Sequence, residues 1–121
     1  MITFDQIEKL LAFDTERRFC VEIFFALTGS EKFSCCWMGK MWSSAEQRDV
    51  YWYGLTPDGL NAFDYSTFGE MADAPVFDGQ SLRQVWERVI IEDIDGCDPV
   101  ERLHDYLDEN SGAPMLGAPR R

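Results

Sequence analysis

The chain has 121 residues, of which 45% are hydrophobic and 14% aromatic, and its formal net charge is −11. This length fits one ordinary domain, and so much apolar material excludes a globally disordered chain. Residues 49–110 carry a net charge of −12, which disfavours direct binding to nucleic acid or to an anionic membrane.

The ends of the chain and its longest apolar stretch bear on where the protein works. The N-terminal sequence MITFDQIEKLL has acids where a signal peptide needs bases. The stretch VEIFFALTG is far shorter than the roughly 18 to 20 apolar residues of a membrane span. We therefore expect a cytoplasmic protein with one globular domain over residues 1–110. Glycine and proline interruptions predict a flexible tail over residues 111–121.

Three helices are predicted from their start signals, over residues 3–13, 81–89 and 98–110. The first two begin with a threonine or serine three residues before a glutamine, which is the spacing of a capping box. The third begins with an aspartate, a favoured N-cap, followed by a proline that suits the first helical position.

The middle of the chain is predicted to be β structure. Residues 18–27, 32–42 and 49–55 are rich in aromatic and β-branched residues and are separated by turn-forming residues. Residues 60–68 alternate only roughly and predict a fourth strand, and residues 69–80 are expected to form a loop. The connections are too short for helical crossovers, so the strands should pair antiparallel.

The segment VIIEDI, at residues 89–94, fits either the end of the second helix or a short edge strand. The fold class predicted from all these elements is α+β. We expect a three- to four-stranded antiparallel sheet with about three helices packed mainly on one face.

The acidic stretch VIIEDIDGCDP, at residues 89–99, raises the question of a metal site. A calcium EF-hand loop needs a bidentate glutamate at its twelfth position. The best alignment starts at Ile91 and places Arg102 there, so we predict no EF-hand, and we expect neither a metal site nor a cofactor. Weak divalent binding near Asp93 and Asp95 stays open.

A turn and a helix cap explain the same stretch better. Asp95 and Gly96 are expected to form a tight turn, and Asp98 is expected to cap the third helix. On this interpretation Glu92, Asp93 and Asp95 are left as exposed charge.

Catalytic motifs are missing from the sequence. The one histidine, His104, stands on the polar side of a predicted helix, and the four cysteines form no Cys-x-x-Cys pair. No Gly-x-Ser-x-Gly and no glycine-rich phosphate loop is present. We therefore predict a non-catalytic protein whose cysteines are free thiols.

Aromatic side chains concentrate in the second and third predicted strands. They are Trp37, Trp42, Tyr51, Trp52 and Tyr53. Because side chains alternate along a strand, the run from Tyr51 to Tyr53 must place rings on both faces of the sheet. Rings on a face without helices would form a protein-binding surface, unless they pack into loops or a dimer.

The leading hypothesis for function is a small acidic inhibitor that occupies a basic, nucleic-acid-binding surface of a partner protein. Spaced carboxylates would stand in for phosphates, as in phage and mobile-element inhibitors of anti-restriction or anti-CRISPR type, a comparison of size and charge alone. We expect such binding to weaken steeply with salt. The candidate contact residues are Asp64, Glu70, Asp73, Asp78, Glu92, Asp93, Asp95, Asp105, Asp108 and Glu109.

The alternative hypothesis is an immunity-type or structural interaction protein that binds through the aromatic sheet face, including as a homodimer. Its binding should resist salt but fail on Trp37→Ala or Trp52→Ala. A third explanation of the charge is that the acids only keep the protein soluble.

Overall fold

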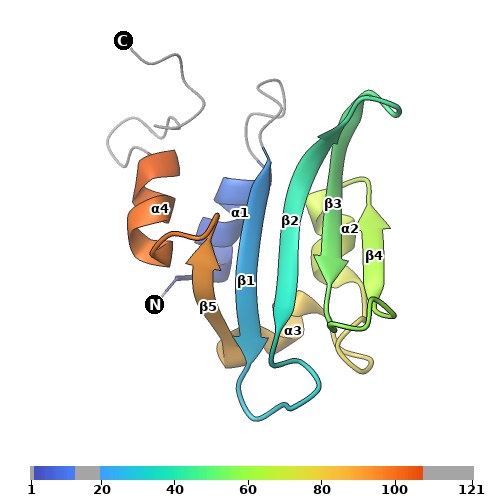
Figure 1. Ribbon diagram of the computed structural model, residues 1–121, viewed down its shortest axis with the longest axis vertical. Helices are drawn as coiled ribbons and strands as arrows, with labels where there is room; N and C mark the ends of the chain where they lie inside the picture. The colour runs from blue at the N-terminus through green and yellow to red at the C-terminus, as the bar shows by residue number, and fades with distance from the viewer. Residues whose placement is uncertain (1, 13–19, 108–121) are drawn as a thin grey trace.

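A five-stranded antiparallel sheet organises residues 2–12 and 20–107, which are the residues that the computed structural model describes (Figure 1). The strands, in spatial order, are β4 (Ala62–Tyr65), β3 (Arg48–Gly54), β2 (Cys36–Ser43), β1 (Val21–Leu27) and β5 (Val89–Ile94). The helical elements are α1 (Phe4–Ala12), α2 (Phe68–Asp73), α3 (Leu82–Val85), the 3₁₀ helix η2 (Trp86–Arg88) and α4 (Pro99–Tyr106).

One face of the sheet is covered by helices, and none of the described helices lies over the other face. In Figure 1, α1, α2 and α3 lie behind the sheet, and α4 lies beside the edge strand β5. Strand β1 shows how its sequence fits this arrangement, because its residues alternate between buried and more exposed positions. Ile23 and Phe25 point to the helices and are fully buried, while Glu22 and Phe24 point to the other face.

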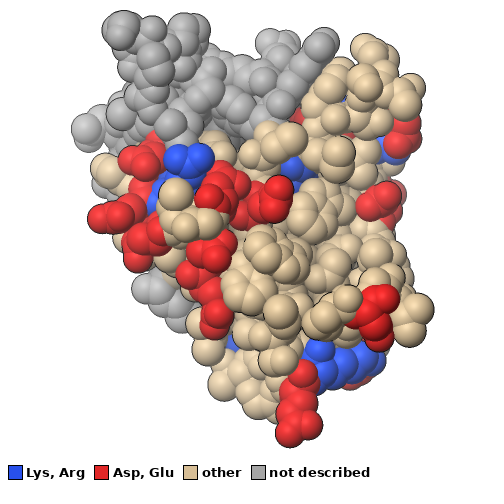
Figure 2. All heavy atoms as spheres, viewed as in Figure 1, with Lys and Arg blue, Asp and Glu red and all other residues tan. Residues whose placement is uncertain are grey.

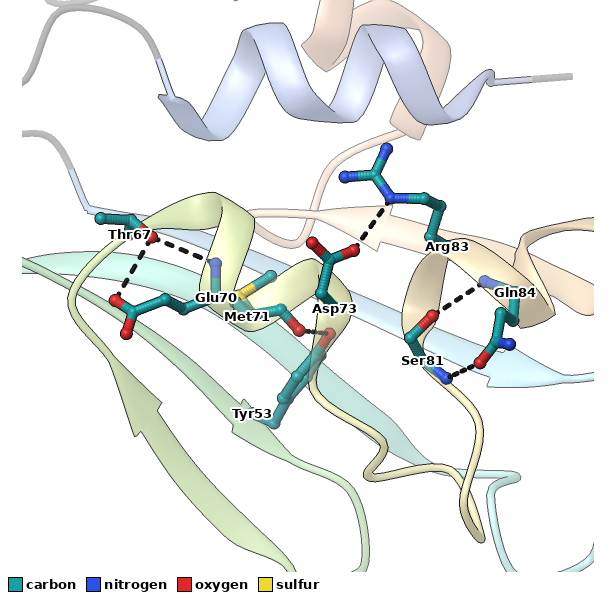
Figure 3. Close-up of polar contacts among 8 residues, drawn as sticks. All are labelled: Tyr53, Thr67, Glu70, Met71, Asp73, Ser81, Arg83 and Gln84. Atoms are coloured by element: carbon teal, nitrogen blue, oxygen red, sulfur yellow. Dashed lines mark hydrogen bonds and ion pairs between the residues drawn. The ribbon is translucent and has the colours of Figure 1, made fainter.

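Polar contacts fix the helical layer on the sheet (Figure 3). The hydroxyl of Tyr53, on strand β3, donates a buried 2.8 Å hydrogen bond to the carbonyl oxygen of Met71 in α2. Asp73, at the end of α2, pairs with Arg83 of α3 at 3.0 Å. Helix α2 is therefore held both to the sheet below it and to the next helix.

The predicted α+β class and the antiparallel pairing are confirmed. The helix start signals are confirmed as well. Thr3 and Gln6 exchange hydrogen bonds of 2.9 and 3.1 Å, and Ser81 and Gln84 form a complete capping box. Asp98 caps α4 by accepting from the backbone N–H of Glu101 at 3.0 Å.

The element count was too low, for two reasons. Residues 89–94 form the edge strand β5, which is the second of the two alternatives expected for them, and pair with β1 across a register shift between Phe24 and Phe25. Residues 68–73 form α2, although they were expected to divide between a strand and a loop. The missed signal is Thr67, whose hydroxyl accepts from the Glu70 N–H at 3.1 Å and caps this helix.

The predicted exposure of Asp95 was also wrong. Asp95 and Gly96 do form the expected tight turn, with positive φ angles of 55° and 78°. The Asp95 side chain, however, turns inward and is only 17% exposed, because it accepts hydrogen bonds from three groups. Its carboxylate is part of the fold.

Two further expectations concern the ends of the chain. The predicted tail, residues 111–121, and the last residues of the predicted domain lie outside the described residues. Within the described part of the chain, no helix has the length and apolar character needed to cross a membrane.

Candidate binding face on the open side of the sheet

The sheet face without helices, which we call the open face, carries two cross-strand rows of residues around its centre. In the first row the strand register aligns Asp93, Phe24, Trp37, Gly54 and Ala62, from β5 to β4. The aromatic rings of Phe24 and Trp37 meet with centroids 4.8 Å apart and planes tilted by 38°. A carboxylate therefore stands at one end of an aromatic pair.

The second row aligns Glu22, Gly39, Trp52 and Asp64, from β1 to β4. A side chain at Gly39 would have its Cβ only 3.0 Å from the Trp52 ring and 2.0 Å from the carbonyl oxygen of Val21. The Trp52 indole thus lies against the bare backbone of Gly39. Trp52 stands between two exposed carboxylates, those of Glu22 and Asp64.

Large apolar side chains on this face are open to solvent. Trp37 is 37% exposed, Met41 48% and Ile90 50%. Figure 2, which views this face, shows uncharged atoms over the middle strands and acidic side chains gathered along the side formed by β5 and α4. A contiguous apolar area with a charged margin is the usual form of a protein-binding surface.

Positive charge is nearly excluded from the five strands, whose only bases are Lys40 and Arg48. Lys40 points to the helix side and is fully buried. Arg48 stands at the end of β3 and forms an ion pair with Glu46. Arg48 is thus paired at the end of β3, and Lys40 lies on the opposite side of the sheet from the two rows.

The sequence-predicted aromatic residues divide between the two sides of the sheet. Trp37 and Trp52 lie on the open face, whereas Tyr51 and Tyr53 are buried under the helices. Burial raises the pKa of the Tyr53 hydroxyl far above its usual range. Trp42 lies on the helix side by strand alternation. Only two of the five rings can therefore contact a partner on the open face.

The sequence-predicted acids do not form one continuous face. Glu92, Asp93 and Asp105 lie on β5 and α4, while Asp64 lies on the opposite edge strand. Glu70 and Asp73 belong to α2, behind the sheet, and Asp78 pairs with Lys32 at 2.6 Å. Asp108 and Glu109 lie outside the described residues.

Two residues of the open face, Glu22 and Phe24, were missed by sequence reasoning. Both residues alternate with the buried positions of β1. The signal that could have identified them is therefore the two-residue repeat of side-chain direction along a strand. Residues 18–27 were predicted to be a strand, but no face of the sheet was assigned to their side chains.

A cavity of about 270 Å³ lies where β2 ends and β3 begins. It is lined by Trp42, Gln47, Arg48, Asp49, Tyr51 and Ser66. Asp49 is only 5% exposed, and neither of its carboxylate oxygens accepts a hydrogen bond from the described residues. Asp49 is the only carboxylate in this lining, which does not provide the pair that acid–base hydrolysis uses.

Within residues 2–12 and 20–107, no group of three or more histidine, cysteine or acidic side chains is arranged to hold a metal ion. Comparisons with known proteins found no matching family model, no significantly similar curated protein and no significantly similar solved structure. The functional argument therefore depends on the geometry of the open face.

Proposed function

We propose that this chain is a non-catalytic binding protein that docks a basic partner protein on the open face of its sheet. The observation that carries the proposal is the strand register, which sets Trp37 and Trp52 beside the carboxylates of Glu22, Asp64 and Asp93. Central aromatic side chains supply much of the energy of protein interfaces. Carboxylates around them attract positively charged partners and repel negatively charged ones.

The charge of this face argues for a partner other than a second copy of the chain. In a symmetric dimer the three carboxylates of each copy would be brought close to those of the other. Burying like charges without counterions is strongly unfavourable. A basic surface would neutralise the same carboxylates, so it is the better complement.

The acidic edge of the molecule favours a partner surface that otherwise binds nucleic acid. This edge comprises the exposed residues Glu92, Asp98, Glu101 and Asp105 on β5, α4 and the turn between them. It continues from the open face on the side where acids gather in Figure 2. An inhibitor of anti-restriction or anti-CRISPR type would use such an array against a phosphate-binding groove, and duplex DNA should then compete for the partner.

Affinity capture with matched variants tests the proposal. The tagged wild type is compared with three variants in a lysate of the source organism, and retained proteins are quantified by mass spectrometry. The variants are the aromatic variant Trp37→Ala/Trp52→Ala, the neutralised variant Glu22→Gln/Asp64→Asn/Asp93→Asn, and the control Glu8→Gln/Glu70→Gln/Glu87→Gln. The last two change the net charge equally, but the control replaces exposed acids of α1, α2 and η2.

We expect a basic protein to be retained by the wild type and by the control, and lost by both open-face variants. High salt should weaken retention without abolishing it, because the apolar contacts persist when charges are screened. Equal loss in the control would show that only net charge matters. Equal retention by all the variants would exclude the open face as the docking surface.

A further inference from the structure

The row of Glu22, Gly39, Trp52 and Asp64 differs from an ordinary apolar patch in how its ring and its charges are arranged. The Cζ2 atom of the Trp52 indole lies 3.0 Å from the place where a Cβ on Gly39 would stand, so the ring extends from β3 over the bare backbone of β2. The half-buried state of Trp52 fits a ring with one side packed and the other side facing solvent. The face of an indole ring attracts cations.

Two carboxylates lie in the same cross-strand row as the Trp52 ring. Asp64 is the direct cross-strand partner of Trp52, so their strands are about 4.8 Å apart. Glu22 lies two strands from Trp52 on the other side, and only Gly39 stands between them in the row. A cation placed over the indole would therefore have a carboxylate on each side in the row.

Among residues 2–12 and 20–107, the recorded contacts place no base at this position. The described cation–π contacts place Lys32 over Phe33, Arg83 over Phe4 and Arg102 over Tyr106. None of the described ion pairs uses Glu22 or Asp64. With respect to the described residues, the ring and the two carboxylates are therefore open to a group that comes from outside.

We infer that Trp52, flanked by Glu22 and Asp64, is the binding position for an arginine side chain of the partner. The inference rests on the proposed function, since it specifies which side chain of the basic partner binds on the open face. A guanidinium is planar and stacks on an indole, while its N–H groups extend in the ring plane toward neighbouring carboxylates. A lysine ammonium is a compact, strongly hydrated charge that makes poorer use of a flat ring with acids on both sides.

Titration with short blocked peptides tests the inference on the wild-type protein. Three peptides differ only at a central arginine, lysine or citrulline, the last being a neutral isostere of arginine. The Trp52 indole N–H signal is followed by ¹H–¹⁵N NMR and is assigned from its loss in Trp52→Phe. We expect a saturable shift with the arginine peptide, about fivefold weaker binding of the lysine peptide and no saturable shift with citrulline.

Variants then locate the cation. Asp64→Asn and Glu22→Gln should each weaken binding of the arginine peptide several-fold, whereas Glu70→Gln, on α2 behind the sheet, should leave it unchanged. The inference is overturned if the arginine peptide gives no saturable Trp52 shift, or if citrulline shifts it equally.

The outcomes also separate this inference from the proposed function. Equal binding of the lysine and arginine peptides, both lost in Asp64→Asn and Glu22→Gln, removes the arginine preference but supports docking of a basic partner. Loss of the arginine peptide in Glu70→Gln alone would place the site that binds basic partners on the helical side and overturn both.

Discussion

Tyr106 donates a 2.6 Å hydrogen bond from its hydroxyl to Oδ2 of Asp95, and this contact joins α4 to the turn that ends β5. The same oxygen accepts from Nε of Arg102 at 3.2 Å. Oδ1 of Asp95 accepts from the backbone N–H of Glu22 at 2.9 Å, where β1 begins. One carboxylate thus ties together α4, the turn and a strand that carries part of the open face.

Replacing Asp95 by asparagine tests this role. Asparagine also tolerates the positive φ of this turn, so the change removes the charge without straining the backbone. We expect Asp95→Asn to lower the free energy of unfolding by about 2 kcal/mol, because hydrogen bonds to a charged acceptor are lost in a partly buried site. Urea unfolding measures the change, and Glu92→Gln, at an exposed position, should alter it by less than about 0.5 kcal/mol. Equal effects would show that Asp95 is ordinary surface charge.

Gly39 and Gly54 form a matched pair for testing the close approach of Trp52. A Cβ on Gly39 would collide with the carbonyl oxygen of Val21, whereas a Cβ on Gly54 meets nothing within 4 Å. Gly39→Ala should therefore cost about 1 to 3 kcal/mol of stability, as overpacking usually does, and should displace the Trp52 ring. Gly54→Ala should be nearly neutral. Thermal unfolding and Trp52 NMR shifts give both readouts, and similar results for the two variants would contradict the packing described here.

The sequence predicted local structure better than it predicted the open face, and particular residues explain why. The caps at Thr3, Ser81 and Asp98 act within four residues, so spacing alone identifies them. The cap at Thr67 obeys the same rule, but the roughly alternating residues around it favoured a strand. Where local signals conflict, tertiary packing decides.

The open face depends on register, which one sequence does not reveal. That Trp52 lies beside Asp64, or that Asp93 and Trp37 flank Phe24, follows from how β1 to β5 pair. Asp95 shows the same limit for charge. Counting acids placed it on a surface, whereas its inward turn depends on Tyr106 and Arg102 of a helix that follows in the chain.

From the buried carboxyl group of Asp49 we predict an unusual pH dependence of the free energy of unfolding. Burial raises the pKa of its carboxyl above the usual value of 3.8, and the charge of Lys40 opposes the rise only in part. The folded state therefore holds this proton at a pH where the unfolded state has released it. The stabilising contribution of the protonated group is fully present below about pH 3.8 and is lost as pH rises through the folded-state pKa.

Asp49→Asn should accordingly raise the free energy of unfolding near neutral pH. Its advantage over the wild type should shrink as the pH falls toward 4. Urea unfolding at a series of pH values measures the difference, with Asp64→Asn, at an exposed site, as the control. Destabilisation by Asp49→Asn at neutral pH would mean that the ionised carboxylate is worth more to the fold than its burial costs.

Cysteine reactivity provides a test of burial that is independent of stability. Cys36 is fully buried in β2, its thiol donates a 3.4 Å hydrogen bond to the carbonyl oxygen of Leu55, and burial raises its pKa to about 12. Cys97 is exposed. Because the thiolate is the reactive form, at pH 8 the thiolate fraction of Cys36 should be lower than that of an ordinary thiol by on the order of a thousandfold.

Alkylation with iodoacetamide at pH 8, followed by mass spectrometry of the peptides, should label Cys97 rapidly and leave Cys36 unlabelled in the folded protein. In urea the two sites should be labelled at similar rates, because unfolding removes the burial that suppresses the Cys36 thiolate. The open face is built on the side of β2 opposite Cys36, so the neutralised variant Glu22→Gln/Asp64→Asn/Asp93→Asn should protect Cys36 as well as the wild type does. Rapid labelling of Cys36 in that variant would show that loss of partner binding reflects unfolding rather than lost contacts.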